Sequence, residues 1–182
     1  DADRVLMTPD RNLAKYVATR TDKEILFWDG CCPIHDRMTR EDVLEAKAAH
    51  PGALFMAHPE CSPAVVEASN YAGSTTQMID YIERMNRGRY LLLTECSMGD
   101  NIAAKNPERE MIRLCSVRCP HMNEITLEQT LAALEKEQYR VEVPEDVAKN
   151  RGEVISACIE TGINYLDITT AAECLCYGVA LK

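Results

Sequence analysis

The sequence lacks the features of membrane, secreted and nucleic-acid-binding proteins. No apolar run approaches the roughly 20 residues that cross a bilayer, and no secretory signal opens the chain, so a cytoplasmic location is expected. Positively charged residues are outnumbered by negatively charged ones, and the formal net charge is −9. This net charge disfavours nucleic acid and anionic membranes as partners. Low-complexity tracts and Pro/Gly/Ser linkers are absent. The 182 residues, 46% of them hydrophobic, can therefore form one or two globular domains.

Cysteine is plentiful, but the spacing typical of a zinc ribbon is missing. There are nine cysteines and no CxxC…CxxC pattern. Without a signal peptide, metal ligation or buried thiols are favoured over disulfides. Most single buried cysteines behave as small hydrophobic residues, so we expect about two of the nine to be ligands. The nine are Cys31, Cys32, Cys61, Cys96, Cys115, Cys119, Cys158, Cys174 and Cys176.

Short apolar runs alternate with longer amphipathic ones, which predicts α/β layers with largely parallel sheets. The strand candidates are Ile25–Trp28, Ala53–Ala57, Tyr90–Thr94 and Tyr139–Val143, and residues 1–7 also lead into a strand. The helix candidates are Arg40–His50, Pro63–Ser69, Thr76–Met85, Leu127–Glu137 and Pro144–Glu160.

Local signals support the helix candidates. Thr39 can cap the first of them, with Asp42 available to complete a capping box. Ser62 and Pro63 form an N-cap followed by an N1 proline. The leucine stripe of residues 127, 131 and 134 has helical spacing, and we interpret it as a face turned to the core.

Reactive residue types follow the predicted strands at the same topological place. In open α/β sheets, sites form beyond the carboxyl ends of strands. Five such segments occur: Asp29–His35, His58–Cys61, Tyr71–Thr75, Glu95–Gly99 and Cys115–Met122. One segment alone would be weak support, but their shared position favours a functional site at this edge.

Two of these segments have both a chemical and a structural interpretation. Pro59 ends ladder pairing and keeps His58 and Glu60 just past the strand, where both could transfer protons. The alternative is a histidine bonded to backbone and a solvated glutamate. Ser74 and Thr75, after Gly73, could bind a carboxylate or phosphate at a helix N-terminus. The alternative there is a plain N-cap.

Spacing alone does not predict a metal centre built from Cys32 and Cys119, because ferredoxin spacings are absent. One alternative is a zinc site made of Cys32, His35, Cys115 and Cys119, in a binding module without catalysis. A second alternative leaves all nine cysteines buried or inert.

Several motifs, taken in order, nevertheless resemble a known family. They are Pro9-Asp10-Arg11-Asn12-Leu13; Trp28, Gly30, Cys32, Pro33 and His35; His58-Pro59-Glu60-Cys61; Gly73-Ser74-Thr75; Thr94-Glu95; and Cys119 with Met122. Over about Val5–Ile163 the chain resembles the quinolinate synthases.

The resemblance implies three similar αβα domains around a pseudo-threefold axis. Each domain would donate one cysteine to a [4Fe–4S] cluster, whose open fourth iron acts as a Lewis acid. The implied reaction condenses iminoaspartate with dihydroxyacetone phosphate to give quinolinate for NAD biosynthesis. An aspartate-oxidising enzyme that supplies iminoaspartate is an implied partner.

The resemblance also implies roles for individual residues. Cys32 and Cys119 would be two cluster ligands, and His58 and Glu60 would contact the reacting intermediate. Glu60 would carry protons, while Ser74 and Thr75 would bind a substrate carboxylate or phosphate. His35 would orient the cluster or line the pocket.

The family's N-terminal domain, with its third cysteine, has no counterpart in the chain, which starts at Asp1. We therefore expect little or no activity from this chain alone. The implied division is residues 1–35, the end of the middle domain; 36–120, a complete αβα domain; 121–163, a C-terminal strand and helices; and 164–182, a tail of unassigned role.

Overall fold

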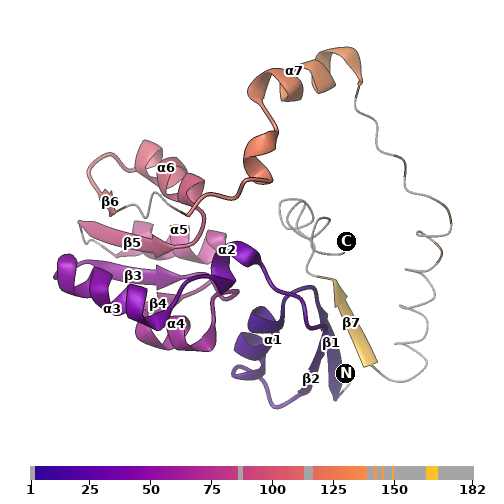
Figure 1. Cartoon of the computed structure of the whole chain (residues 1–182), viewed down its shortest axis with the longest axis horizontal. Coiled ribbons are helices and arrows are strands. Elements are labelled where there is room, and N and C mark those ends of the chain that lie inside the picture. Colours follow the sequence, from indigo (N-terminus) through magenta and orange to yellow (C-terminus); the bar gives the residue numbers. More distant parts are fainter. Residues whose placement is uncertain are drawn as a thin grey trace.

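The fold is α/β with two parallel sheets, as the strand and helix alternation predicts. A computed structural model describes residues 3–85, 88–112, 117–138, 142, 145, 149 and 163–167. Figure 1 shows the two sheets side by side, with the short helix α2 (Pro33–Asp36) between them.

The first sheet has strand order β2-β1-β7, and all its pairs are parallel. Its strands are β1 (Arg4–Thr8), β2 (Glu24–Phe27) and β7 (Ile163–Asp167). Helix α1 (Arg11–Ala18) connects the first two strands, and the carboxylate of Asp10 caps it by accepting from the Leu13 amide. The sequence did not predict α1 or β7.

The second sheet is parallel throughout and has strand order β4-β3-β5-β6. Its strands are β3 (Leu54–Ala57), β4 (Tyr71–Ala72), β5 (Arg89–Leu93) and β6 (Glu110–Ile112). Its helices are α3 (Arg40–Ala49), α4 (Pro63–Ala68), α5 (Thr75–Arg84) and α6 (Cys96–Lys105).

Two cores sandwich this second sheet. Val43 of α3 and Val65 of α4 pack with Phe55 and Leu91 on one face. On the other face, residues of α5 and α6 pack with Met56 and Tyr90. Alternation along β3 thus buries both faces of the strand, which explains its continuous apolar run.

Local sequence signals placed β2, β3, β5, α3, α4 and α5 correctly but did not predict α2, α6, β4 or β6. The predicted strands at 25–28, 53–57 and 90–94 match β2, β3 and β5 within one residue at each end. The Thr39–Asp42 capping box is present, and Pro63 stands in the first turn of α4. The candidates at 139–143 and 144–160 lie almost wholly outside the described residues.

A β–α–β unit followed by Cys-Pro occurs twice. Strands β1 and β2, with α1 between them, lead to Cys32-Pro33, which opens α2. Strands β5 and β6, with α6 between them, lead to Cys119-Pro120, which precedes the short 3-10 helix η1 (Met122–Glu124). In both places the carbonyl of the cysteine accepts from the amide four residues later. The two cysteines therefore occupy equivalent places, while the pseudo-threefold arrangement stays a prediction.

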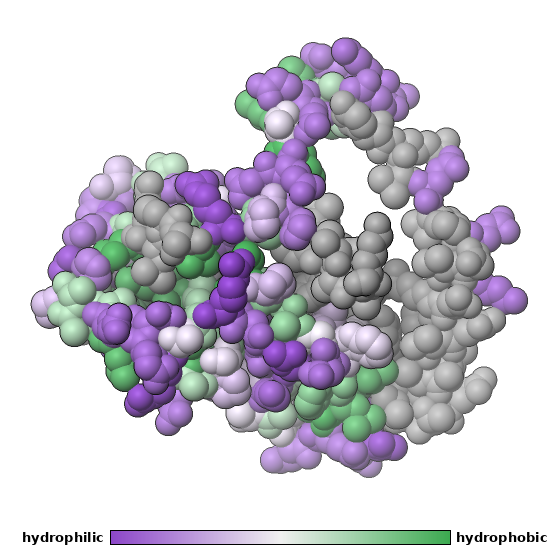
Figure 2. All heavy atoms as spheres, viewed as in Figure 1, coloured by the Kyte–Doolittle hydropathy of each residue, from purple (hydrophilic) through white to green (hydrophobic). Residues whose placement is uncertain are grey.

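Helix α7 (Leu127–Lys136) forms as predicted, but its leucine stripe is not a core face. Leu127 is 80% exposed, Leu131 52% and Leu134 78%. The interpretation as a core face is therefore wrong for the part of the chain that the structure describes. Figure 1 shows why: α7 projects away from both sheets. In Figure 2 its hydrophobic residues are visible among hydrophilic ones.

Candidate active site

The candidate site lies where the carboxyl ends of the strands of both sheets meet. Asn12 of α1 donates to the carbonyl of Glu60 at 3.1 Å, and Tyr16 donates to the carbonyl of Ala72 at 3.1 Å. These bonds join the first sheet to the loops that follow β3 and β4. The carboxyl ends of parallel strands lie at one edge of a sheet, so the described parts of the segments that the sequence singled out lie at that edge.

Asp10 fixes the loop that carries Cys32. One carboxylate oxygen of Asp10 accepts from the Cys32 amide at 2.8 Å, and the other accepts from the Leu13 amide at 2.7 Å. The neighbouring backbones also touch, because a Cβ at Gly30 would come within 2.5 Å of the Pro9 carbonyl oxygen. Position 30 therefore requires glycine for close approach. The Cys32 backbone is thus bound at its amide by the Asp10 carboxylate and at its carbonyl by the Asp36 amide, at 2.9 Å.

Glu60 is the centre of a buried polar group. Its Oε2 lies 2.8 Å from His35 Nδ1 and 3.7 Å from His58 Nδ1. The two imidazole rings stack with centroids 4.6 Å apart. His35 Nε2 lies 2.9 Å from the Thr94 hydroxyl at the end of β5. All four of these side chains are buried, so their mutual contacts replace hydration.

The environment drives the pKa values of the two histidines apart. Burial, together with the positive charge of His35, lowers the pKa of His58 to about 4. Burial also opposes a charge on His35, but hydrogen bonding and negative charge from Cys32 and Glu60 outweigh it and raise that pKa to about 9. Near neutral pH, His58 is therefore neutral and His35 is positive beside the Glu60 carboxylate.

Cys32 and Cys119, 87 positions apart in the sequence, pack in one small buried cluster. Ile34 completes the cluster and Val117 packs against it. Cys32 is 4% exposed and Cys119 2%. The two loops thus pack together, as a shared metal centre would require, and Cys32 also lies near Glu60. The ligand role itself stays a prediction.

Ser74 and Thr75 are placed at the start of α5, where both are exposed. The Ser74 hydroxyl accepts from the Gln77 amide at 3.3 Å, and Gln77 reciprocates at the Ser74 amide, which completes a capping box. Among the described contacts, none joins these hydroxyls to Glu60 or His58. The plain cap is therefore present, and anion binding stays a prediction.

The other described cysteines show no ligand geometry. Cys61 is buried in the core, where its thiol donates to the Leu93 carbonyl at 3.3 Å. Burial raises the pKa of Cys61 to about 12. Cys96 begins α6, and Cys31 is partly exposed beside Arg11 and Asp36. The remaining four, Cys115, Cys158, Cys174 and Cys176, lie outside the described residues.

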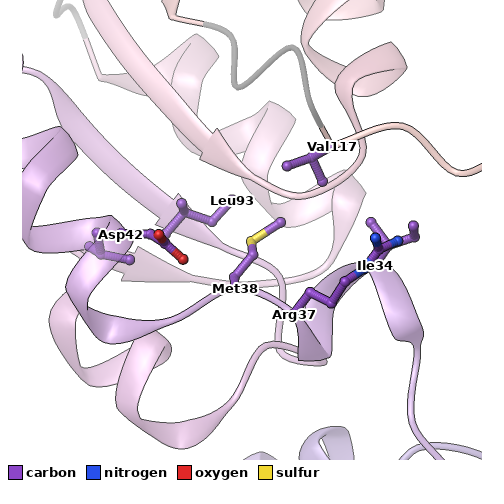
Figure 3. A pocket seen from close by; sticks show the side chains of 7 residues that line it. Ile34, Arg37, Met38, Asp42, Leu93 and Val117 are labelled. Atoms are coloured by element: carbon purple, nitrogen blue, oxygen red, sulfur yellow. The ribbon is translucent and has the colours of Figure 1, made fainter.

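A hollow of about 320 Å³ opens beside the site (Figure 3). Apolar side chains from α2, the start of α3, β5 and the segments before α3 and before Cys119 line most of it, with Arg37 and Asp42 as the polar members. Asp42 is already engaged in the cap of α3. Ile34 lines this hollow while its neighbour His35 contacts Glu60, so the one turn of α2 contributes to both places.

Sequence reasoning did not assign roles to Asp10, Asn12 and Thr94, although their motifs stand out. Asp10 caps α1 and binds the Cys32 loop, Asn12 binds the Glu60 backbone, and Thr94 contacts His35. The only available signal was Asp10, which directly precedes a helical segment. Such a position indicates a helix cap, but it does not indicate the hydrogen bond from the Cys32 amide.

Comparison with known proteins shows the family of the chain. A family model described as quinolinate synthetase A protein matches residues 1–160. The chain is 46% identical over 145 residues to quinolinate synthase 2 of Mesorhizobium japonicum, covering 80% of this chain and 44% of that protein. It is 47% identical to quinolinate synthase of Agrobacterium fabrum, with 80% and 42% covered. For quinolinate synthase 1 of Methanosarcina acetivorans the identity is 44%, with 81% and 49% covered.

The chain spans a little under half the length of these curated relatives. Its two Cys-Pro turns and its buried His–Glu group belong to the segment that matches. On the family match and these identities, the chain belongs to the quinolinate synthetase A family.

Proposed function

We propose that this chain forms the part of a quinolinate synthase that carries two ligands of a [4Fe–4S] cluster. The whole enzyme would condense iminoaspartate with dihydroxyacetone phosphate to quinolinate, in de novo NAD biosynthesis. The relatives that carry the name quinolinate synthase support the activity. The observation that supports the cluster is the meeting of Cys32 and Cys119 in one buried group. An aspartate-oxidising enzyme would supply the iminoaspartate, and the cytoplasmic location stays a prediction.

The residues fit such a group. Thiolates are the usual ligands of iron–sulfur clusters, and the two thiols sit at equivalent places after β2 and β6. Within the described residues, this small group holds no third cysteine, so a further ligand has to come from elsewhere. When three thiolates hold the cluster, its open iron supplies Lewis-acid chemistry to substrate oxygen atoms.

Glu60 and His58 are suited to proton transfer and substrate binding. The positive His35 lies against Glu60 and favours its carboxylate form, so Glu60 can accept a proton from substrate carbon or nitrogen. His58 is neutral near pH 7 and can both donate and accept hydrogen bonds without adding charge. The burial of both groups keeps competing water away from them.

Ser74 and Thr75 would bind a substrate carboxylate or phosphate at the start of α5. Two features support this role: the helix is ten residues long, so its first amides favour an anion; and Gly73 directly precedes the pair. Since the Ser74 hydroxyl already caps the helix, the backbone amides and Thr75 would make the new contacts.

A chimera tests the proposal within a relative of full length. Residues 1–160 replace the matching segment of the Agrobacterium fabrum enzyme, and iron, sulfide and quinolinate are measured after anaerobic reconstitution. We expect about four irons per chain and quinolinate production, both lost in Cys32→Ser and Cys119→Ser. Cys61→Ser, a matched buried cysteine outside the cluster, should keep both. Full iron content and activity in Cys119→Ser would refute the ligand assignment.

The 182-residue chain alone should make little or no quinolinate, because two thiolates hold a cubane poorly and the chain spans under half the length of its relatives. The same reconstitution of the unfused chain checks this expectation. Four irons per chain together with quinolinate production would show that the chain is sufficient.

A further inference from the structure

Three different donor atoms converge beside α2. They belong to Cys32, His35 and Glu60, and a sulfur, a ring nitrogen and a carboxylate oxygen lie within 4.8 Å of one another. The three residues are 4%, 7% and 3% exposed. Such burial is uncommon for a histidine and a glutamate unless specific partners hold them.

His35 Nδ1 has an unusual environment. It lies 2.8 Å from Glu60 Oε2, and the imidazole is hydrogen bonded by both the Glu60 carboxylate and the Cys32 thiol. Hydrogen bonds to one imidazole engage the thiol and the carboxylate separately, although all three donor atoms face one another within 4.8 Å. A shared metal ion accounts for all three.

We infer that Cys32, His35 and Glu60 form a site for a single divalent cation of borderline softness, of the zinc class. One sulfur, one nitrogen and one oxygen donor suit Zn²⁺ and similar first-row ions, whereas Mg²⁺ and Ca²⁺ prefer oxygen alone. Three protein ligands leave the fourth position of a tetrahedron open, which is the pattern of reactive rather than structural zinc sites.

Surrounding contacts hold each of the three ligands in place. Thr94 binds His35 Nε2 at 2.9 Å, which leaves Nδ1 as the nitrogen that faces the ion. Asp10 holds the Cys32 amide at 2.8 Å, and Asn12 holds the Glu60 carbonyl at 3.1 Å. Such outer contacts set the tautomer and orientation of metal ligands. Outer contacts therefore support all three ligands.

This site overlaps the proposed cluster at Cys32 alone and goes beyond the proposed function. It needs no thiol from Cys119 and no residue from outside the described part of the chain. The two share Cys32, so one ion in this site and a cluster on Cys32 and Cys119 exclude each other. The chain is thus expected to be colourless with zinc in this site and brown with an iron–sulfur cluster on Cys32 and Cys119.

Cobalt titration of the 182-residue chain tests the inference. The chain is stripped with EDTA under argon and titrated with Co²⁺, and the absorption spectrum reports both geometry and ligand type. We expect one Co²⁺ per chain, with the intense visible bands of tetrahedral cobalt and a thiolate charge-transfer band in the near ultraviolet. Cys32→Ser should lose the charge-transfer band, and His35→Gln and Glu60→Gln should each weaken Co²⁺ binding at least about tenfold.

Two controls separate this site from the cluster. Cys31→Ser removes the neighbouring, more exposed thiol and should leave the cobalt spectrum unchanged. Cys119→Ser should also keep the cobalt spectrum, although it is expected to abolish the cluster in the chimera. Loss of cobalt binding in Cys119→Ser, or its persistence in Cys32→Ser, would overturn the assignment while leaving the cluster proposal to its own test.

Thermal unfolding of the unmodified chain covers the case in which a variant does not fold. Because an ion that binds only the folded state stabilises it, Zn²⁺ should raise the melting temperature of the EDTA-stripped chain and Mg²⁺ should not. The absence of a rise with Zn²⁺, an equal rise with Mg²⁺, or a cobalt spectrum of octahedral type without charge transfer would each overturn the inference.

Discussion

Replacement of Asp10 by alanine should destabilise the chain far more than an ordinary helix cap does. The Asp10 carboxylate is 1% exposed and accepts from the amides of Cys32 and Leu13 at 2.8 and 2.7 Å. Each hydrogen bond to a charged acceptor contributes about 1.5 to 3 kcal/mol. Burial of the carboxylate is unfavourable and raises the Asp10 pKa, which offsets part of this gain. We therefore expect a net loss of about 3 kcal/mol for Asp10→Ala.

Asp42→Ala is the matched control. Asp42 also caps a helix, through Thr39, but its hydrogen bonds are exposed to solvent. Its loss should reduce the free energy of unfolding by about 1 kcal/mol or less. For a chain of this length about 3 kcal/mol corresponds to a fall of roughly 6 to 12 °C in melting temperature, against roughly 2 to 4 °C for the control.

Thermal unfolding followed by far-ultraviolet circular dichroism measures both variants. Asp10→Asn, which keeps one acceptor oxygen, should fall between wild type and Asp10→Ala. Equal melting temperatures for Asp10→Ala and Asp42→Ala would refute the reasoning, because they would show that the buried bond to the Cys32 loop adds nothing to the cap.

Three further outcomes are expected. Leu127→Gln should change the free energy of unfolding by less than about 0.5 kcal/mol in urea titrations, since the side chain is 80% exposed; a loss of several kcal/mol would mean that this leucine is covered in solution. The folded pKa of His58, about 4, is below its ordinary 6.5, so its contribution to stability is present above pH 6.5 and is lost as pH falls toward 4. His58→Gln should flatten that part of the pH profile in denaturant titrations, and an unchanged slope would contradict the assigned shift. Cys61, 1% exposed with a pKa of about 12, should resist iodoacetamide at pH 8 while Cys31 is labelled, as peptide mass mapping would show.

The sequence predicts features of this fold that depend on neighbouring residues. Phe55 and its neighbours form a run that is apolar at every position, which is typical of a strand buried on both faces. Thr39 and Asp42 are three residues apart, so their reciprocal cap is encoded locally. Neither feature requires knowledge of the rest of the structure.

Features that depend on distant contacts were not predictable in the same way. The Cys-Pro pairs set Cys32 and Cys119 apart from Cys61, which has a similar burial, but nothing local indicates that these two cysteines meet. The spacing of the leucines on α7 predicts a helix correctly, but the surface that such a stripe contacts is not encoded in the spacing. Likewise, the second bond of Asp10 depends on how the loops after β1 and β2 meet.

The repeated Cys-Pro turn has a consequence for how metal and folding are coupled. Each thiol stands just beyond the last strand of its own β–α–β unit, so the two sulfurs become neighbours only after both units have formed and docked. A metal centre that bridges them would act as a clamp, and its binding energy would oppose separation of the units more than unfolding of either one. Withdrawal of iron should then loosen the junction first, and hydrogen exchange should rise at the Cys32 and Asn123 amides before it rises in β3 and β5.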